Sequence, residues 1–367
     1  MYLKNIKLTD FRNYESLSID LSKKINILHG DNAQGKTNFL ESIYFLALTK
    51  SHRSLSDELL LNNNKENFMV KGDLVLNSGT KKFKIVYKNN DGKQLFIDGE
   101  KITKSTDYIS NINVIIFYPE DLDIIKGSPG VRRKYFDTQL GQLDKNYAKT
   151  LLEYNKILRT RNECLKQESV NHQYIEAIDK YLIDRASVIY IMRNKFVKKI
   201  NNHIYKIYNN ITGDLNLNLI YESNISNDLT KEEIKNQLTI KLKNNYKFDL
   251  KNKKTNIGPH LDDFKFILND NNLKEYGSQG QQRAAILSLK LSEIEIFYQY
   301  KNEKPILLLD DVFSELDEIK KKNLLSYINK DLQTIITTTE IETLDKELIK
   351  NSNLIKINSG KIIEEGV

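Results

Sequence analysis

Alternating apolar and polar residues indicate that the N-terminal part of the chain is rich in β-strands. Leu3 to Leu8 and Leu17 to Leu21 partly alternate, and a polar turn at residues 10–13 separates them. A second alternating region covers residues 68–102, where Asp91-Gly92 predicts a tight hairpin. These patterns predict at least one antiparallel sheet.

Continuous apolar runs add a different kind of strand. Ile25 to Leu28 and Val114 to Phe117 are short and wholly apolar or nearly so, which is typical of strands buried on both faces. Between them, residues 37–50 carry apolar side chains at three- and four-residue steps, which predicts an amphipathic helix. The first part of the chain therefore indicates a mixed α/β structure.

The pattern becomes helical from about residue 128 to 211. Apolar residues recur at helical spacing in two runs, which predict two long helices packed antiparallel: first Leu140, Leu143, Tyr147, Leu151, Tyr154 and Leu158, then Ile175, Ile178, Leu182, Ala186 and Ile189 through to Ile207. The tyrosines in these runs stand at core positions, so we interpret them as packing residues. Residues 212–255 are polar and irregular, with one helix expected at Thr230 to Leu238, and the α/β pattern returns at about Asn256.

This order predicts one α/β head that is split in sequence by a helical lobe. We assign residues 1–125 and 256–367 to the two parts of the head, and residues 126–255 to the lobe. The predicted fold class is an ABC-type P-loop ATPase head, with mixed sheets and flanking helices. Two independent domains are the alternative, and the motifs after residue 256 argue against it.

Composition narrows the class of protein. The 367 residues are 40% hydrophobic and 29% charged, which suits a folded protein with a large core, and no apolar run approaches the ~18 residues of a membrane span. Cys164 is the one cysteine, so no internal disulfide can form and a reducing cytoplasm is expected. The net charge of +7 permits a polyanionic partner without identifying one.

A phosphate-binding loop follows the strand at residues 25–28. The segment fits G-x-x-x-x-G-K-[ST] at every fixed position and precedes the predicted helix, so its backbone N–H groups and the helix N-terminus would face phosphate oxygens. Lys36 would reach the β- and γ-phosphates of ATP, and the Thr37 hydroxyl would bind Mg²⁺. The predicted nucleotide-binding residues are Gly30, Asp31, Asn32, Ala33, Gln34, Gly35, Lys36, Thr37 and Asn38.

Two carboxylates follow an apolar strand at residues 305–309. Asp310 fits a water-mediated ligand of Mg²⁺, and Asp311 fits the residue that orients or deprotonates the attacking water. We predict Lys36, Asp310 and Asp311 as catalytic residues, and Thr37 with Asp310 as the metal site. A buried strand that ends in an acidic loop is the alternative interpretation.

Two further segments are similar to ABC-type ATPases. Tyr276 to Arg283 resembles the ABC signature, which precedes a helix predicted at about Ala284 to Tyr298, and residues 314–317 match the S-x-L-D loop after the acidic strand. The resemblance implies that Ser278, Gly280 and Gln281 contact a γ-phosphate bound to a second subunit. A polar turn with a good helix cap is the alternative.

Taken together, the motifs resemble the RecF family of bacterial recombination-mediator ATPases over nearly the whole chain. The matching stretches are Asp10 to Tyr14, the phosphate loop, Ser51 to Arg53, Tyr118 to Leu122, Gly127 to Pro129 with Arg132-Arg133, Gly258 to His260 with Asp262-Asp263, Gly277 to Arg283 and Leu308 to Asp317. Leu261 stands where the family usually has arginine. Thr337-Thr338-Thr339 replaces the ABC switch histidine, as it does in RecF.

The resemblance implies a weak, DNA-dependent ATPase that uses ATP and Mg²⁺. It further implies ATP-driven homodimerisation on double-stranded DNA at single-strand gaps, partnership with RecR and RecO, indirect promotion of RecA loading, and no membrane association. Arg53, Arg132 and Arg133 are the predicted DNA contacts, with solvated surface arginines as the alternative.

Two other functions are weighed against this prediction. An SMC-like structural DNA clamp with incidental ATPase activity would share the head, but an insertion of about 130 residues is too short for a long coiled-coil arm. A transporter ATPase would need a membrane-coupling partner and far fewer helical residues between its motifs.

Overall fold

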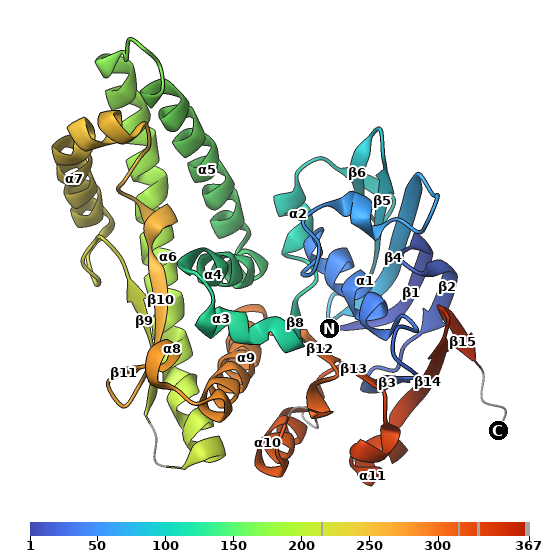
Figure 1. The fold of residues 1–367 in the computed structure, drawn as a ribbon. Coiled ribbons are helices and arrows are strands. Elements are labelled where there is room, and N and C mark those ends of the chain that lie inside the picture. The colour runs from blue at the N-terminus through green and yellow to red at the C-terminus, as the bar shows by residue number, and fades with distance from the viewer. Residues whose placement is uncertain (214–215, 315, 329–330, 364–367) are drawn as a thin grey trace. The chain divides into compact units, whose positions relative to one another are not determined.

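The computed structural model describes residues 1–213, 216–314, 316–328 and 331–363 (Figure 1). The chain forms two compact units: a head unit of residues 1–121 and 287–367, and a helical unit of residues 122–286. Residues 256–286, which we expected in the head, group with the helical unit. The physical reason is strand pairing, because Asp263–Leu268 pairs with Leu217–Glu222 inside that unit.

A mostly parallel sheet forms the centre of the head unit. Its strand order is β15-β14-β3-β13-β12-β8, and only β15 runs antiparallel to its neighbour. The strands are β3 (Ile25–His29), β8 (Val114–Phe117), β12 (Ile306–Asp310), β13 (Thr334–Thr338), β14 (Ser352–Asn358) and β15 (Lys361–Ile363). Every residue of β3, β8, β12 and β13 is buried, as the continuous apolar runs predict.

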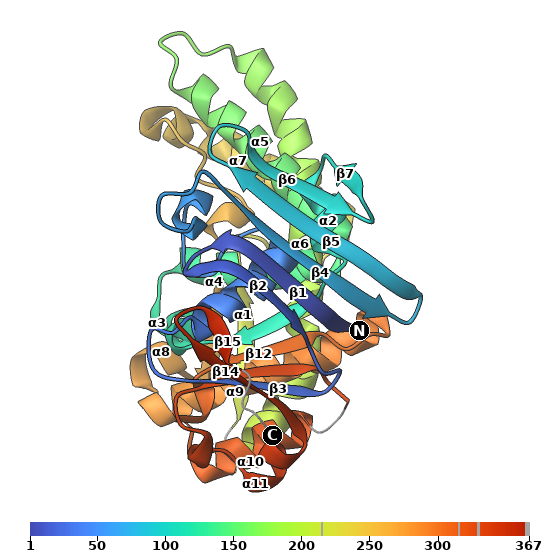
Figure 2. The same cartoon turned by 90° about the vertical axis from the view of Figure 1, so that its right-hand side faces the viewer.

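The second sheet of the head unit is antiparallel, with the order β2-β1-β4-β5-β6-β7. Its strands are β1 (Tyr2–Phe11), β2 (Tyr14–Asp20), β4 (Asn67–Leu76), β5 (Gly79–Lys88), β6 (Gly92–Ile97) and β7 (Glu100–Ile102). The predicted hairpin at Asp91-Gly92 is confirmed, and Gly92 has the positive φ of 70° that such a turn requires. One face of this sheet packs with the first helix in the main core, and Figure 2 shows the other face turned to the viewer.

Helices flank these sheets. The head unit contains α1 (Lys36–Leu48), α2 (Ser105–Ile109), α10 (Glu318–Ile328) and α11 (Lys346–Lys350), with short 3₁₀ turns at Asp57–Leu60, Val312–Ser314 and Ile341–Thr343. A further 3₁₀ turn, Pro119–Leu122, follows β8 at the boundary of the unit. The predicted helix at residues 37–50 is therefore confirmed as α1 within two residues.

The helical unit contains more structure than the sequence predicts. Its elements are α3 (Asp123–Lys126), α4 (Pro129–Leu143), α5 (Lys145–Leu165), α6 (His172–Thr212), β9 (Leu217–Glu222), α7 (Lys231–Asn252), a 3₁₀ turn (Pro259–Leu261), β10 (Asp263–Leu268), β11 (Asn271–Asn272), α8 (Leu273–Tyr276) and the start of α9 (Gln279–Lys301). The first predicted long helix is in fact two, because Asp144 ends α4 and its side chain caps α5. In the described part of residues 212–255, Leu217–Glu222 forms β9, and the helix expected at Thr230 to Leu238 is the longer α7, Lys231–Asn252.

Buried ion pairs join the helices of this unit. Arg161 on α5 is fully buried and bonds Asp179 on α6 at 2.6 Å and Asp249 on α7 at 2.7 Å. Tyr147 and Tyr154 are also buried, so the prediction that they pack in the core is confirmed. Because a buried charge that lacks a partner is costly, these pairs fix how α5, α6 and α7 pack on one another.

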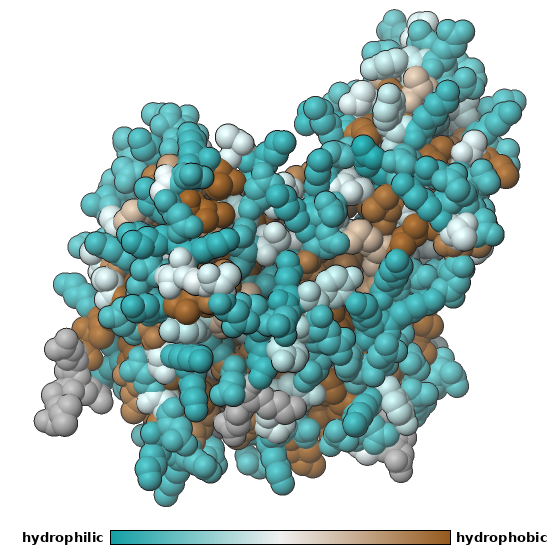
Figure 3. All heavy atoms as spheres, turned by 180° about the vertical axis from the view of Figure 1, so that it is seen from behind, coloured by the Kyte–Doolittle hydropathy of each residue, from teal (hydrophilic) through white to brown (hydrophobic). Residues whose placement is uncertain are grey.

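The surface agrees with the charged composition. The face in Figure 3 is mostly hydrophilic on both units, with apolar residues scattered between polar ones. Among the residues that the structure describes, no helix is both long enough and apolar enough to cross a bilayer.

Candidate nucleotide site

The phosphate loop leaves β3 at the carboxyl end of the parallel sheet and leads into α1. Gly30 and Gly35 have φ values of 144° and 115°, which residues with a side chain rarely adopt. A Cβ at Gly30 would also lie 2.3 Å from the carbonyl oxygen of Ile357 on β14. The loop therefore needs glycine at both fixed positions, for conformation and for space.

Neighbouring elements hold the loop in place. The Asn13 side chain and the backbone N–H of Gly360 both donate to the carbonyl of Gln34, each at 3.0 Å. The Tyr14 hydroxyl donates to the carbonyl of Gly35 at 2.9 Å. Asp31, Asn32 and Ala33 form the exposed crown of the loop. These contacts leave the crown facing solvent while its base is fixed.

Lys36 folds back over the loop that it follows. Its ammonium group donates to the carbonyls of Gly30 at 2.6 Å and Asp31 at 2.7 Å. Burial lowers the pKa of Lys36, and the carboxylates of Asp311 and Asp310 oppose that shift. Gly35 in the N-cap position offers no side chain to cap α1, so the first backbone N–H groups of the helix remain available to an anion.

The predicted acidic residue lies beside the predicted metal ligand. The Thr37 hydroxyl donates to Asp310 Oδ1 at 2.9 Å, and the Thr337 hydroxyl on β13 donates to the same oxygen at 2.7 Å. Burial raises the pKa of Asp310, and these two hydrogen bonds oppose the shift. Asp311 follows with a positive φ of 52°, and its N–H donates to the Thr337 hydroxyl at 3.1 Å.

These residues fit a magnesium ion. A hydroxyl and a carboxylate in contact at the ends of β12 and α1 are hard oxygen donors, which Mg²⁺ prefers, and Mg²⁺ usually takes few protein ligands beside phosphates and water. No group of three or more His, Cys, Asp or Glu side chains that could hold a metal exists among the described residues. A site that relies on ATP phosphates for its remaining ligands is consistent with both observations.

Arg53 lies at the edge of this site. Its side chain is 42% exposed, donates to Asn38 Oδ1 at 3.1 Å and lies 3.8 Å from Glu41. Its positive charge opposes the rise in the pKa of Asp310 that burial causes. Fully buried Glu41 also accepts two hydrogen bonds from Arg12, at 2.8 and 2.9 Å. Arg53 is thus linked to the residue that follows Thr37, and its predicted DNA contact stays a prediction.

The signature residues belong to the helical unit and start α9. The Ser278 N–H donates to Gln281 Oε1 at 2.9 Å, and the Gln281 N–H donates to Ser278 Oγ at 3.2 Å, which together form a capping box. Ser278 and Gly280 are exposed, and a Cβ at Gly280 would meet Ser278 Oγ at 3.9 Å, an ordinary contact. Because this capping box fixes its start, α9 begins at Gln279, five residues before the predicted start at Ala284.

The two predicted arginine contacts of the helical unit differ. Arg132 is 5% exposed, bonds both oxygens of Asp263 at 2.6 and 2.9 Å, and donates to the carbonyls of Ile125 and Gly127. A side chain with all these partners is not available to a phosphate, so our prediction for Arg132 is corrected: it is a structural residue. Arg133 is half-buried and donates to the Asp262 carbonyl at 2.7 Å, and its DNA contact stays a prediction.

Two residues of other motifs, His260 and Asp317, have structural partners. His260 contacts the Tyr154 hydroxyl at 2.6 Å and the Thr255 carbonyl at 3.1 Å, and burial lowers its pKa, while neighbouring Leu261 is 46% exposed. In the S-x-L-D loop, Asp317 Oδ1 accepts from the Lys320 N–H at 3.0 Å at the start of α10. Glu315 lies outside the described residues.

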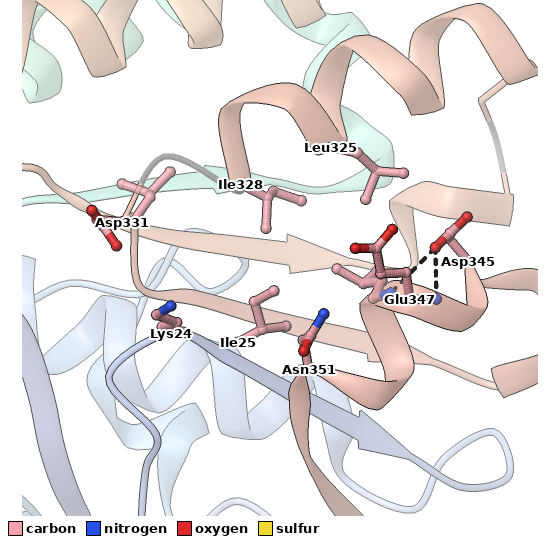
Figure 4. A pocket seen from close by; sticks show the side chains of 10 residues that line it. Lys24, Ile25, Leu325, Ile328, Asp331, Asp345, Glu347 and Asn351 are labelled. Atoms are coloured by element: carbon pink, nitrogen blue, oxygen red, sulfur yellow. Dashed lines mark hydrogen bonds between the residues drawn. The ribbon is translucent and has the colours of Figure 1, made fainter.

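A pocket in the head unit lies at the opposite end of the parallel sheet from the phosphate loop. It has a volume of about 350 Å³ and is lined by residues of β3, α10 and α11, among them Ile25, Ile328 and Leu348 (Figure 4). Ile25 begins β3, whereas the phosphate loop follows the last residue of that strand. Since ligands of open α/β sheets bind at the carboxyl ends of the strands, this pocket is not the nucleotide site.

Comparison with known proteins agrees with this geometry. Residues 2–362 match the family model "RecF/RecN/SMC N terminal domain". The "DNA replication and repair protein RecF" of Oenococcus oeni is 39% identical over 99% of this chain and 100% of its own length. The protein of the same name from Clostridium botulinum strain Okra is 43% identical over 99% of this chain and 99% of its own length.

The chain belongs to the RecF family. A solved "Structure of the recombination mediator protein RecF-ATPrS in RecFOR pathway" is 34% identical, covers 100% of this chain and 98% of its own, and has a TM-score of 0.91. The Smc head domain of Pyrococcus furiosus, with 14% identity and a TM-score of 0.56 over 99% of this chain and 96% of its own, shares the fold. The predicted fold class, an ABC-type ATPase head, is therefore confirmed, and the RecF resemblance that the motifs predict is confirmed with it.

Sequence reasoning missed several residues that shape the site of this RecF-family chain. Thr337 was noted only for the histidine it replaces, although its place at the end of β13 puts its hydroxyl on Asp310. Asn13 and Tyr14 were quoted as part of a motif without a role, yet both hold the phosphate loop. The role of Thr337 depends on the position of β13 between β3 and β12 in the sheet. The spacing of residues in the sequence does not predict which strands become neighbours.

Proposed function

We propose that this RecF-family chain is an ATP-hydrolysing, DNA-binding recombination mediator. The observation that carries the proposal is the meeting of Thr37, Asp310 and Lys36 at the carboxyl ends of β3 and β12, which flank β13 in the parallel sheet. This arrangement can take a nucleoside triphosphate, and the RecF relative with ATPrS in its description supports ATP as that nucleotide. A split head with a helical lobe, and a cytoplasmic location, are part of the same proposal.

The proposed chemistry assigns one task to each residue. Lys36 exchanges its two carbonyl partners for β- and γ-phosphate oxygens, which also compensates the burial of its charge. Thr37 and Asp310 hold Mg²⁺, which when bound neutralises charge on the phosphates. Asp311 orients or deprotonates the attacking water. Residues 30–38 bind the nucleotide through backbone N–H groups and the start of α1.

A second copy of the chain completes the site in this proposal. Ser278, Gly280 and Gln281 of the partner copy approach the γ-phosphate, and the exposure of Ser278 and Gly280 at the N-terminus of α9 supports that role. ATP therefore drives dimerisation, and hydrolysis releases the pair. By family membership the dimer binds double-stranded DNA at gaps, works with RecR and RecO, and promotes RecA loading; weak hydrolysis would depend on DNA.

Sedimentation velocity tests this proposal directly. The wild-type chain is expected to be a monomer with ADP and a dimer with ATP and Mg²⁺. Lys36→Ala should stay monomeric, because it loses its charge–phosphate contacts. Lys322→Ala on α10 removes a distant exposed lysine and serves as the matched control. A Lys36→Ala protein that dimerises with ATP like the control would contradict the proposal.

The alternative of an SMC-like structural clamp has less support. The longest helix, α6, has 41 residues and so spans only ~60 Å, a compact lobe and not a long arm. Under the clamp hypothesis, Asp311→Asn would abolish hydrolysis yet leave repair in cells intact. Under our proposal the same change traps the dimer on DNA and impairs repair.

A further inference from the structure

Four lysines stand in one line across the outward face of the antiparallel sheet. The strand register pairs Lys7 with Lys71, Lys71 with Lys84, Lys84 with Phe96, and Phe96 with Lys101. The line therefore crosses β1, β4, β5, β6 and β7 without a gap. We call Lys7, Lys71, Lys84 and Lys101 the lysine row.

All four side chains are on the solvent side of the sheet. Along β4 the buried residues Val70, Gly72 and Leu74 alternate with the less buried Met69, Lys71 and Asp73. Lys7 and Lys101 are exposed, and Lys71 and Lys84 are half-exposed. Figure 2 shows no helix of the head unit over this face of the sheet. The row is thus open to a large partner.

The lysine row places like charges side by side, which destabilises the sheet, and the fold itself does not require this arrangement. Like charges directly opposite each other on neighbouring strands destabilise a sheet, and here Lys71 faces a lysine on both sides. No described carboxylate forms an ion pair with any of the four lysines. Lys84 instead lies over the Phe96 ring, 4.3 Å from its centre, which holds its ammonium group at the surface.

The neighbouring rows set the limits of the positive surface. On one side lie Thr9, Met69, Val86 and Gln94, which are uncharged. On the other side Asp73 pairs with Asn5 and with Lys82, and Asp20 pairs with Asn5. Asp73 accepts a hydrogen bond from the Asn5 side chain at 3.0 Å. The positive charge is therefore a narrow track and not a broad patch.

The dimensions of the track suit a nucleic-acid backbone. Strands lie ~4.8 Å apart, so the four strand steps from Lys7 to Lys101 span roughly 19 Å. Duplex DNA carries one charge per ~1.7 Å of its axis, so each lysine can reach a phosphate along that length. Phe96, the aromatic residue in the row, is covered by Lys84 and so is not presented for base stacking.

We infer that the lysine row is a binding track for the phosphate backbone of duplex DNA, read without regard to sequence. The inference rests on the proposed function, in that it locates the DNA contact which that function requires. It adds a surface on the head unit that is separate from Arg53 and Arg133.

Duplex binding measured by fluorescence anisotropy across a salt series, with ATP and Mg²⁺ present, tests the inference. The variant is Lys7→Gln/Lys71→Gln/Lys84→Gln, and the matched control is Lys322→Gln/Lys346→Gln/Lys350→Gln, three exposed lysines of α10 and α11. The row variant should bind at least ~10-fold more weakly at 0.1 M salt. Its slope of log affinity against log salt should fall by about 0.9 per lysine that is neutralised.

Two further measurements keep the test decisive. The row variant should retain ATP-driven dimerisation, and its melting temperature should equal or exceed that of wild type, because charge repulsion is relieved. If the row variant binds DNA like wild type, or if the control loses as much affinity, the lysine row is not the track, while the proposed function stands. If wild type itself does not bind duplex DNA with ATP at low salt, the proposed function fails as well.

Discussion

His52 is a titratable side chain enclosed by aromatic rings near the nucleotide site. Its ring lies 5.0 Å from that of Tyr44 and 5.1 Å from that of Tyr118, centre to centre, and neither ring nitrogen has a hydrogen-bond partner among the described residues. Burial lowers the pKa of His52 to about 4, and Glu41 opposes the shift while Arg53, Lys290 and Arg12 add to it. The folded protein therefore favours the neutral imidazole.

This shift predicts acid sensitivity. The unfolded chain binds a proton at His52 below about pH 6.5 while the folded chain does not, so His52 contributes stability that is present above pH 6.5 and lost as the pH falls toward 4. His52→Gln should remove up to ~2–3 kcal/mol of that pH dependence. Urea unfolding of wild type and His52→Gln at pH 7 and pH 5, without nucleotide, measures this loss of unfolding free energy. If both proteins lose the same unfolding free energy between pH 7 and pH 5, His52 is not the source of the acid sensitivity.

Asp310 shows how much of the site can be predicted at the residue scale. The motif alone predicts both Asp310 and Thr37, and the structure brings them into contact at 2.9 Å. The predicted DNA contact of Arg132 is wrong because the motif does not show that this side chain is buried. Its partner, Asp263, lies 131 residues away along the chain. Side chains of fixed motifs are therefore predictable, whereas the availability of a surface arginine depends on distant strand pairing.

At the scale of elements, the start of α9 combines two roles in Gln281. Its side-chain oxygen caps the helix through the Ser278 N–H, while its amide NH₂ group is a donor suited to the γ-phosphate of the proposed dimer. A glutamate can form the same capping box but brings a negative charge. Substitution by glutamate or by alanine therefore separates capping from phosphate binding.

We predict opposite orders for stability and dimerisation. Gln281→Ala should cost about 1 kcal/mol of unfolding free energy through the lost cap, whereas Gln281→Glu should cost little. ATP-driven dimerisation should suffer more in Gln281→Glu, by at least ~10-fold (about 1.4 kcal/mol), because a carboxylate repels the phosphate. Thermal melting and sedimentation with ATP measure the two effects. If Gln281→Glu dimerises with ATP as strongly as wild type, Gln281 acts only as a helix cap.

Elements of strong periodicity were predicted well, and their ends were not. Residues 175–207 read as one helix and form most of α6, because core contacts recur along its whole length. The break at Asp144 was missed, since the apolar spacing continues across it from α4 into α5. Strand β9 was missed because Leu217, Leu219 and Tyr221 alternate within a polar segment and gain their burial only by pairing with β10.

At the scale of the whole molecule, two compact units with separate cores predict two unfolding transitions. The helical unit has its own buried network around Arg161 and contains none of the predicted phosphate-loop residues. ADP and Mg²⁺, with which the chain is expected to stay monomeric, should stabilise only the unit that binds them, by mass action.

Hydrogen exchange of the full chain in increasing urea measures this. Peptides from α1 and β12 should lose protection together, and peptides from α6 should do so at a different urea concentration. Added ADP and Mg²⁺ should move the first transition to higher urea and leave the second within error. The Lys36→Ala protein is the control, because it should show neither shift. One common transition for all peptides would contradict the two-unit description.

Strand β3 lies between β13 and β14, so, among the residues that the structure describes, its partners both come from the last tenth of the chain. During translation at ~5–20 residues per second, β3 therefore waits roughly 15–60 seconds on the ribosome before either neighbour emerges. A nascent chain cannot capture nucleotide in that interval. Ribosome stalling or premature termination before β13 is translated would yield a product in which β3 remains unpaired, open to chaperones and proteases.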